Sequence, residues 1–232
     1  MKTDKEINAD TTQESQADLR ANPTAVSQAI ESNETKPDVL YIPDFLTQAE
    51  ADELLARIGT AADFRQNYIQ IYGRKAIPRL EAWYSPWDYP YSKGVVLEAA
   101  PIPDYLQRVI DKMKDAGFGE FNAVLINRYR DGNDYISPHS DDDYGDARPT
   151  IPSLTLGAAR PFRLAKWIVK GKKLDKSTTV EYTPGHGDLI VMRGDTNVKW
   201  GHWVPKTAKK IGERINLTFR YGVARSVKDT NK

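Results

Sequence analysis

The segment "YISPHSDDD", residues 135–143, places one histidine beside three carboxylates, a combination typical of metal sites. His139 and Asp141 are two residues apart, so in an extended chain both side chains project to the same side and can reach one ion. His202 follows 61 residues after Asp141 and supplies a second imidazole. Two histidines and one carboxylate can occupy one face of an octahedral iron ion and leave three positions open for a co-substrate and oxygen. Because the chain contains no cysteine, its metal sites must consist of histidine, carboxylate and water ligands.

A second group of charged residues follows in the segment "RINLTFR", residues 214–220. Arg214 and Arg220 lie six residues apart on an expected strand, and this even spacing puts both side chains on one face. Two guanidinium groups on one face can bind a dicarboxylate through charge-assisted hydrogen bonds.

Each of these features alone has an ordinary structural explanation. An isolated His-x-Asp motif is common, a histidine between tryptophans packs as an aromatic neighbour, and two arginines on a strand form surface ion pairs worth little. Their joint order is more specific, because His-x-Asp, a long gap, His and then Arg occur within one strand-rich segment. That order matches the oxygenases that use Fe(II) and 2-oxoglutarate on a double-stranded β-helix.

Short strands are expected to position these residues. Alternating apolar residues between Gly, Pro and Asp turns predict strands over residues 39–46, 67–73, 78–85, 89–94, 121–129, 152–157, 160–167, 178–183, 187–194 and 214–222. Residues 162–170 and 177–185, joined by the polar segment 171–176, are expected to form a long hairpin. Closely spaced strands without intervening helices indicate a mainly β (α+β) fold, a sandwich or barrel, rather than a parallel α/β sheet.

Two helices are expected on the N-terminal side of most of these strands. Thr47 is the expected N-cap of the first helix, which Gly59 should end. Residues 103–117 form an amphipathic pattern for the second helix, with Gly117 as its end.

The composition is that of an ordinary globular protein, with 40% hydrophobic and 28% charged residues among 232. Residues 1–38 contain four Lys/Arg against eight Asp/Glu and no aromatic residue, so we expect a mostly disordered tail. Residues 39–232 then carry 29 basic and 24 acidic side chains, a balance that suits a nucleic-acid partner. We expect no signal peptide, because the first residues lack the basic-then-apolar pattern, and no spanning helix, because no apolar run approaches ~18 residues. We therefore expect no membrane partner and a cytoplasmic location, or a nuclear one in a eukaryote.

The residues around the two motifs resemble one family in particular. The segments 122–143 and 214–220 are similar to the AlkB family of Fe(II)/2-oxoglutarate-dependent nucleic-acid dealkylating dioxygenases, in the branch of the eukaryotic nuclear repair members. The similarity extends through "IPRLEAWYS", "YPYSKG", "PIPDYL" and "SLTLGAARPFRL", and so covers roughly residues 40–222. It implies a double-stranded β-helix (jelly-roll) core with N-terminal helices, in one domain over 39–232 with a substrate-covering lid at about 64–100.

The resemblance also implies a role for individual residues. The Fe(II) ligands would be His139, Asp141 and His202. The contacts to 2-oxoglutarate would come from Asn127, Tyr129, Arg214, Asn216 and Arg220. The contacts to the substrate base would come from Asp143, Tyr91 and Tyr89. Which arginine meets which carboxylate of 2-oxoglutarate stays open, and the branch often has Glu where this chain has Asp143.

The activity implied by the resemblance is oxidative demethylation of N1-methyladenine and N3-methylcytosine in DNA. The reaction would consume O2, convert 2-oxoglutarate to succinate and CO2, and release formaldehyde. We expect a monomer whose partner is alkylated DNA. The alternatives are an RNA demethylase with the same chemistry and a catalytically silent nucleic-acid-binding module. The presence of all three metal ligands and both arginines argues against the silent module.

The sequence of the aromatic segment 83–91 allows two interpretations. Trp83 and Trp87 belong either to the core or to the base pocket, since both environments suit tryptophan. In the same way, Tyr68 or Tyr72 could insert into a duplex or pack as core residues of a strand.

Overall fold

The computed structural model describes residues 35–70, 74–92, 95–141 and 150–222, and of residues 70, 74, 91 and 92 the backbone alone. The expected tail over 1–38 therefore lies outside the described residues except for its last four positions. No helix in the described ranges is both long and apolar enough to cross a membrane.

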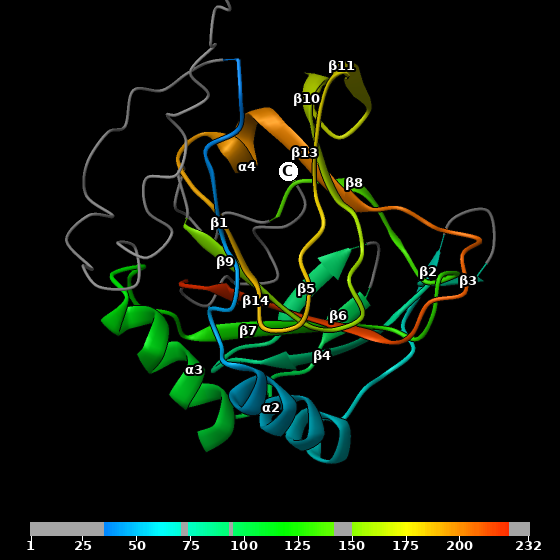
Figure 1. Cartoon of the computed structure of the whole chain (residues 1–232). Helices are drawn as coiled ribbons and strands as arrows, with labels where there is room; N and C mark the ends of the chain where they lie inside the picture. The colour runs from blue at the N-terminus through cyan, green and yellow to red at the C-terminus, as the bar shows by residue number, and fades with distance from the viewer. Residues whose placement is uncertain (1–34, 71–73, 93–94, 142–149, 223–232) are drawn as a thin grey trace, which may run out of the picture.

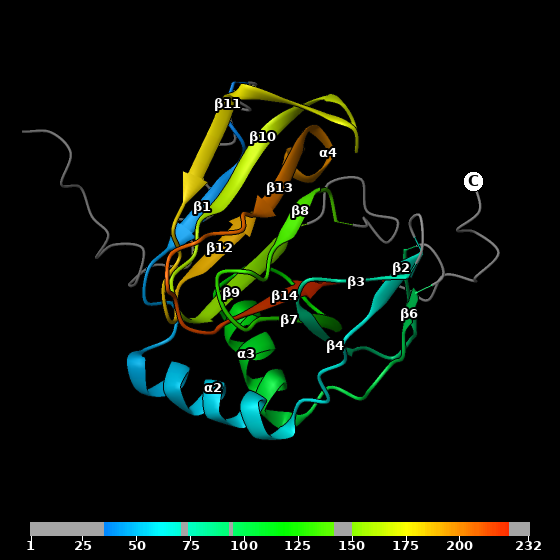
Figure 2. The same ribbon diagram turned by 90° about the vertical axis from the view of Figure 1, so that its right-hand side faces the viewer.

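Two antiparallel sheets face one another (Figures 1 and 2). The larger sheet has six strands, in the order β1 (Val39–Ile42), β12 (Leu189–Met192), β9 (Ile151–Gly157), β14 (Arg214–Arg220), β7 (Ala123–Tyr129) and β4 (Leu80–Tyr84). The smaller sheet has four, in the order β11 (Lys173–Tyr182), β10 (Phe162–Val169), β13 (Trp200–Val204) and β8 (Ile136–His139). Two short hairpins complete the β structure: β2 (Tyr68–Gln70) with β3 (Arg74–Ala76), and β5 (Tyr89–Ser92) with β6 (Val95–Leu97).

From β7 to β14 the chain passes back and forth between the two sheets. β7, β9, β12 and β14 belong to the larger sheet, while β8, the β10–β11 hairpin and β13 belong to the smaller one. This alternation is the winding of a double-stranded β-helix, and it confirms the expected fold class. It also places segments far apart in sequence side by side, as β8 and β13 are.

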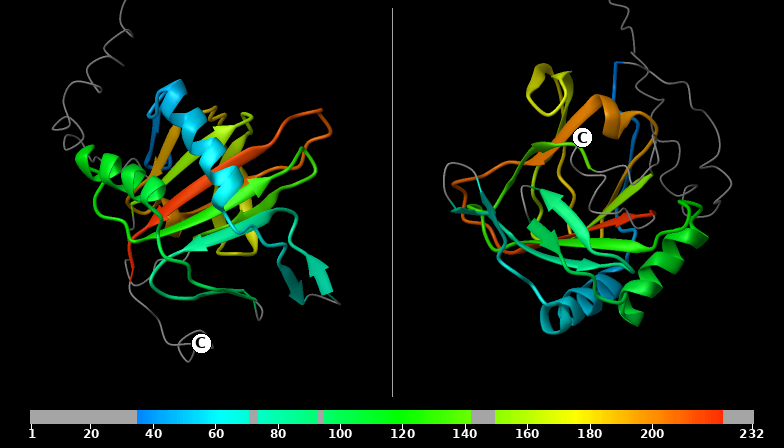
Figure 3. Two further views of the ribbon diagram at one scale, coloured as in Figure 1. Left: turned by 90° about the horizontal axis from the view of Figure 1, so that it is seen from below. Right: turned by 180° about the vertical axis from the view of Figure 1, so that it is seen from behind.

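Both long helices cover the outer face of the larger sheet. Figure 3 shows α2 (Gln48–Ala61) and α3 (Asp104–Asp115) lying across that face, away from the smaller sheet. The main hydrophobic core lies between them and the sheet, and it includes Leu54 of α2, Leu106 of α3 and Leu217 of β14.

The start of α2 is as expected, but its end is not. The Thr47 side chain accepts from the Glu50 amide, and the Glu50 carboxylate accepts from the Thr47 amide, which makes a capping box. The expected end at Gly59 was wrong, because the helix continues to Ala61 and the amide of Ala62 still reaches the Ile58 carbonyl. An exposed glycine within a helix costs only about 1 kcal/mol, which is too little to end it.

The end of α3 confirms the expected glycine stop. Gly117 has φ of 80°, in the left-handed region that glycine adopts without strain. Its amide donates to the Lys114 carbonyl, and the amide of Phe118 donates to the Met113 carbonyl. These two bonds satisfy carbonyls that the last turn leaves open.

The β10–β11 hairpin is longer than the sequence indicated. Residues 171–176 were expected to join the strands, but β11 already begins at Lys173 and the tight turn lies between Val169 and Lys172. The short helix α4 (Thr196–Lys199), which precedes β13, was not expected at all. A helix of four residues has no periodicity from which to predict it.

The two faces of the larger sheet differ in chemistry. On β14, Ile215, Leu217 and Phe219 face the helices and belong to the main core. The alternate residues of β14 are polar and are buried as well: Arg214, Asn216, Thr218 and Arg220. They lie on the inner face, toward the smaller sheet. Burying such groups is costly unless each finds a partner, so this inner face is where a binding site is to be sought.

Candidate metal and co-substrate site

Three ligand-type side chains meet at one end of the space between the sheets. His139 is the last residue of β8, and its Cα partner across the strand pair is His202 on β13. Asp141 follows two residues after His139. The ligand atoms of the three residues all lie within 4.8 Å of one another. The sequence motif and the distant histidine are therefore brought together, as the sequence predicted.

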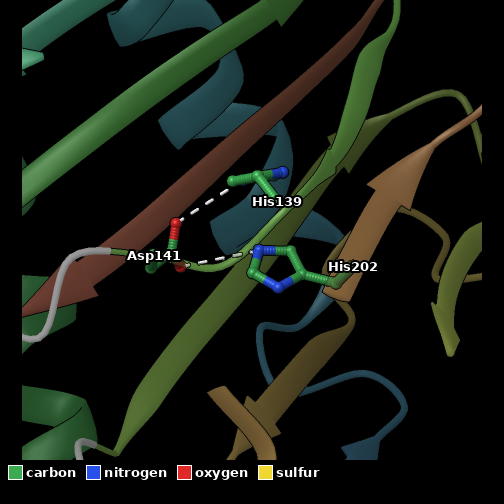
Figure 4. Close-up of side chains that lie close together, drawn as sticks. All are labelled: His139, Asp141 and His202. Carbon is green, nitrogen blue, oxygen red and sulfur yellow. Dashed lines mark ion pairs between the residues drawn. The ribbon is translucent and has the colours of Figure 1, made fainter. Parts of the chain in front are cut away.

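The Asp141 carboxylate lies beside the two imidazoles and faces both of them (Figure 4). Its Oδ1 is 3.6 Å from Nε2 of His139, and its Oδ2 is 3.7 Å from Nε2 of His202. The Nδ1 of His139 lies 2.9 Å from the Ser137 carbonyl, and because a carbonyl only accepts, Nδ1 carries the proton. The Nε2 of His139 is therefore left with a lone pair, as a metal ligand requires.

The protonation states of Asp141 and His202 suit a metal ion. The Nη2 of Arg220 lies 2.7 Å from Oδ1 of Asp141, and both side chains are buried. Burial alone would raise the pKa of Asp141, but the positive charge of Arg220 and the nearby histidines outweigh it, so this pKa lies far below its usual value. Burial, and then the neighbouring His139, lower the pKa of His202 to about 3. At neutral pH the site thus offers an ionised carboxylate and a neutral His202 imidazole, the forms that bind metal.

The unexpected helix α4 holds the aspartate in place. Asn197 lies in α4 and is buried. Its Oδ1 accepts from the Asp141 amide at 2.8 Å, and its Nδ2 donates to the Asp141 carbonyl at 2.9 Å. This pair of bonds fixes the backbone of Asp141. The sequence carried no signal for Asn197, because 56 residues separate it from Asp141.

The inner face of the larger sheet carries the five residues expected to bind 2-oxoglutarate. Tyr129 and Asn127 of β7 pair across the ladder with Arg214 and Asn216 of β14. The Nη2 of Arg214 donates to Oδ1 of Asn216 at 2.6 Å. Arg220 ends the same row beside Asp141. These residues form one continuous polar surface that ends at the three metal-ligand candidates.

Arg214 is a buried cation with spare donors. It is 1% exposed, and its Nη2 donates to the neutral side chains of Thr155 and Asn216. Its Nε and Nη1 are buried with no hydrogen-bond partner among the described residues. Burial lowers its pKa to about 10, so it is still protonated at neutral pH. A buried guanidinium with two unsatisfied donors is suited to bind an anion.

Two buried arginines in this region were not singled out from the sequence. Arg79 donates to Oδ1 of Asn127 at 2.7 Å and pairs with Glu81 at 2.6 Å, so it orients the Asn127 amide. Arg160 donates to the backbone carbonyls of Asp131, Asp134 and Pro205. The sequence around Arg79 and Arg160 does not distinguish them from surface arginines. Only the structure shows that both side chains are buried.

The residues expected to contact the base are less fully described. Asp143 lies outside the described residues, and so does the side chain of Tyr91. Tyr89 is buried, with its ring 5.0 Å from that of Trp83. Trp83 itself donates to the Trp87 carbonyl and belongs to a small core cluster with Tyr89.

The third histidine lies away from the site. The Nδ1 of His186 accepts from the Gly157 amide at 2.8 Å, so its Nε2 carries the proton that faces Asp52 at 3.2 Å. His186 therefore has a structural role: its hydrogen bonds connect the end of β9 to α2.

Comparison with known proteins agrees with this geometry. The 2OG-Fe(II) oxygenase superfamily matches residues 38–220 of the chain. The DNA oxidative demethylase ALKBH2 of Homo sapiens is 33% identical over 180 residues, which cover 75% of this chain and 69% of the relative. The alpha-ketoglutarate-dependent dioxygenase alkB homolog 3 of Homo sapiens is 32% identical over 208 residues, which cover 88% of this chain and 69% of the relative. The chain belongs to the AlkB family of 2OG-Fe(II) oxygenases.

A solved structure supports the fold of this AlkB-family chain. OsALKBH1 superposes with a TM-score of 0.57, covering 84% of this chain and all of that one, at 14% identity. At that identity the likeness concerns the fold alone. Membership of the family makes this protein a dioxygenase that uses Fe(II), 2-oxoglutarate and O2, and the grouping of His139, Asp141 and His202 fits that requirement.

Proposed function

We propose that His139, Asp141 and His202 are the Fe(II) ligands of this enzyme. The proposal is supported by their proximity, by the lone pair on Nε2 of His139 and by the ionised state of Asp141. The donor set of two imidazoles and one carboxylate is the one that non-haem Fe(II) oxygenases use. When bound with 2-oxoglutarate and O2, the iron supplies the oxidising power that inserts one oxygen atom into a substrate C–H bond.

The row of polar residues on the larger sheet would hold 2-oxoglutarate. Arg220 lies beside Asp141, so we assign to it the carboxylate nearest the metal. Arg214 lies farther along β14, and its unsatisfied Nε and Nη1 suit the distant carboxylate. Asn216, Asn127 and Tyr129 border the same surface. The buried, unsatisfied guanidinium of Arg214 is the observation that carries this assignment.

The substrate we propose is an N-alkylated base in DNA, with N1-methyladenine and N3-methylcytosine as the preferred lesions. This rests on the similarity to a relative named DNA oxidative demethylase and on the implied base contacts of Asp143, Tyr89 and Tyr91. Hydroxylation of the N-methyl carbon gives an N-hydroxymethyl base, which loses formaldehyde and leaves the unmodified base. 2-Oxoglutarate loses CO2 and becomes succinate, taking up the second oxygen atom.

The protein's part in this reaction is positioning and selection. A base must leave the helical stack before its methyl group can reach a buried site. The lesions carry a positive charge, so the carboxylate of Asp143 would favour them over the neutral, undamaged bases. An aromatic side chain such as Tyr91 would stack on the extruded ring.

A demethylation assay on methylated oligonucleotides tests the proposal. The enzyme would be given Fe(II), ascorbate and 2-oxoglutarate, and mass spectrometry would record the loss of 14 mass units, about one CH2, from each methylated strand. Loss from methylated DNA that disappears in Asp141→Ala supports the proposal. Demethylation confined to methylated RNA would replace DNA by RNA as the substrate. Succinate formation without any demethylation would overturn the proposed substrate class and leave the dioxygenase intact.

A further inference from the structure

We propose that Trp167 is a positioning residue that fixes the spacing of the metal ligands by bridging the strands that carry them. The inference rests on the proposed assignment of His139, Asp141 and His202 as ligands. It does not depend on the substrate. Trp167 lies on β10, two strands away from β8 in the smaller sheet.

The first observation is how closely Trp167 packs on Gly201, the residue before His202. A Cβ atom at position 201 would lie 2.3 Å from Cζ2 and 2.7 Å from Cε2 of the indole. No side chain larger than hydrogen leaves room for the ring. Gly201 does not have a positive φ, so glycine is required here for space and not for backbone conformation.

The second observation is a hydrogen bond from the indole nitrogen, which is bonded to the Cε2 atom that packs on Gly201. The indole Nε1 donates to the Ser140 hydroxyl at 3.0 Å. Ser140 stands between His139 and Asp141 in the chain. One side chain from β10 therefore passes over β13 at Gly201 and is bonded to the segment that carries the other two ligands.

The backbone alone holds β8 weakly against β13. β8 is the edge strand of its sheet, and its register with β13 shifts between the pairs His202–His139 and Val204–Ile136. Because neighbouring residues of a strand face opposite sides, Gly201 lies on the outer side when His202 faces inward. The indole thus joins the two strands from outside, at the level where the two histidines approach to 4.3 Å between ring centroids on the inside.

Two small changes test this role. Trp167→Phe keeps an aromatic ring but removes the donor. Ser140→Ala removes the acceptor, together with the long hydrogen bond of 3.5 Å that the same hydroxyl donates to the Trp200 carbonyl. We expect each to weaken the binding of Co(II) to the full-length, substrate-free protein by roughly tenfold, the lower end of what outer contacts of metal sites contribute. The double variant should bind Co(II) no more weakly than Ser140→Ala alone, because both lack the hydrogen bond between the indole and the hydroxyl.

A third pair of variants tests the packing on Gly201. Gly201→Ala should weaken Co(II) binding and alter the visible absorption spectrum of the bound Co(II), because the added methyl group displaces the ring. In a Trp167→Ala background the same Gly201→Ala change should have no further effect. An equal effect in both backgrounds would show that Gly201 acts independently of Trp167.

Trp203→Phe is a matched change on β13, and it leaves the hydrogen bond between Trp167 and Ser140 in place. This variant should leave Co(II) affinity unchanged. Circular dichroism would confirm that each variant is folded. If Trp167→Phe and Ser140→Ala both keep wild-type affinity and the wild-type Co(II) spectrum, the positioning role is overturned. If His202→Ala also binds Co(II) like the wild type, the metal site itself is misassigned, and that outcome is distinct from failure of the Trp167 proposal alone.

Discussion

Arg214 shows most directly how single residues prepare this site for an anion. Folding has buried its positive charge against neutral partners, which costs free energy that a bound carboxylate would recover. Arg214→Met should therefore raise the KM for 2-oxoglutarate by roughly 30-fold or more, the equivalent of about 2 kcal/mol.

The same variant separates binding from stability. Arg214→Met should change the free energy of unfolding of the ligand-free protein by less than about 1 kcal/mol, because it removes an uncompensated buried charge while Asn216 keeps its bond from Ser153. Urea unfolding and 2-oxoglutarate titration would measure the two quantities. A large loss of stability with an unchanged KM would contradict the role given to Arg214.

Asn197 is the residue through which α4 acts on the metal site. Asn197→Ala removes both hydrogen bonds to the backbone of Asp141, and we expect about tenfold weaker Mn(II) binding, measured by calorimetry. Val198→Ala, at the exposed neighbour on the same helix, is the matched control and should bind as the wild type does. Equal affinity in Asn197→Ala would show that Asp141 is held by other contacts.

At the scale of elements, Arg160 joins the connection after β7 to the connection after β13. It is fully buried and satisfies three carbonyls, those of Asp131, Asp134 and Pro205. Arg160→Met would leave these carbonyls without that donor, so we expect a loss of about 3 kcal/mol in the free energy of unfolding. Chemical denaturation would measure it. A loss below about 1 kcal/mol would mean that water replaces the guanidinium.

Much of the element structure could be predicted from the sequence, since local signals specify it. Thr47 with Glu50, and Gly117 with its positive φ, mark helix ends through their own backbone chemistry. Gly59 gave a wrong prediction of the end of α2. The free energy that a glycine costs within a helix is smaller than the stabilisation gained when the helix continues to Ala61. The alternation in β14 predicted that Arg214 and Arg220 share a face, but no local signal showed that this face is buried.

The candidate site could be predicted only in part, because its parts come from different elements. His139 and Asp141 share a motif, and the family resemblance joined His202 to them. Asn197 and Trp167 act through contacts that only the winding of the chain between two sheets creates. Their residue types carry no metal chemistry, so nothing in the sequence pointed to them.

At the scale of the whole molecule, the proposed metal ligands draw on β8 and β13 of the smaller sheet. Mn(II) should therefore stabilise the folded state as a whole, by about 2.7 kcal/mol when its free concentration is one hundred times Kd. Thermal unfolding with and without Mn(II) would measure this as a rise in Tm. His202→Ala should show no rise, and an equal rise in that variant would place the stabilising ion elsewhere.

The position of β14 in the larger sheet limits how much of the protein can fold during translation. β14 is the last strand of the described chain, yet it lies between β9 and β7. While the ribosome is still adding residues before 214, β9 can pair with β12 and β7 with β4, but no strand joins β9 to β7. Both arginines of the proposed co-substrate site are also missing. The larger sheet can therefore close, and the proposed 2-oxoglutarate site can be completed, only after β14 has been synthesised, although all three proposed iron ligands precede it.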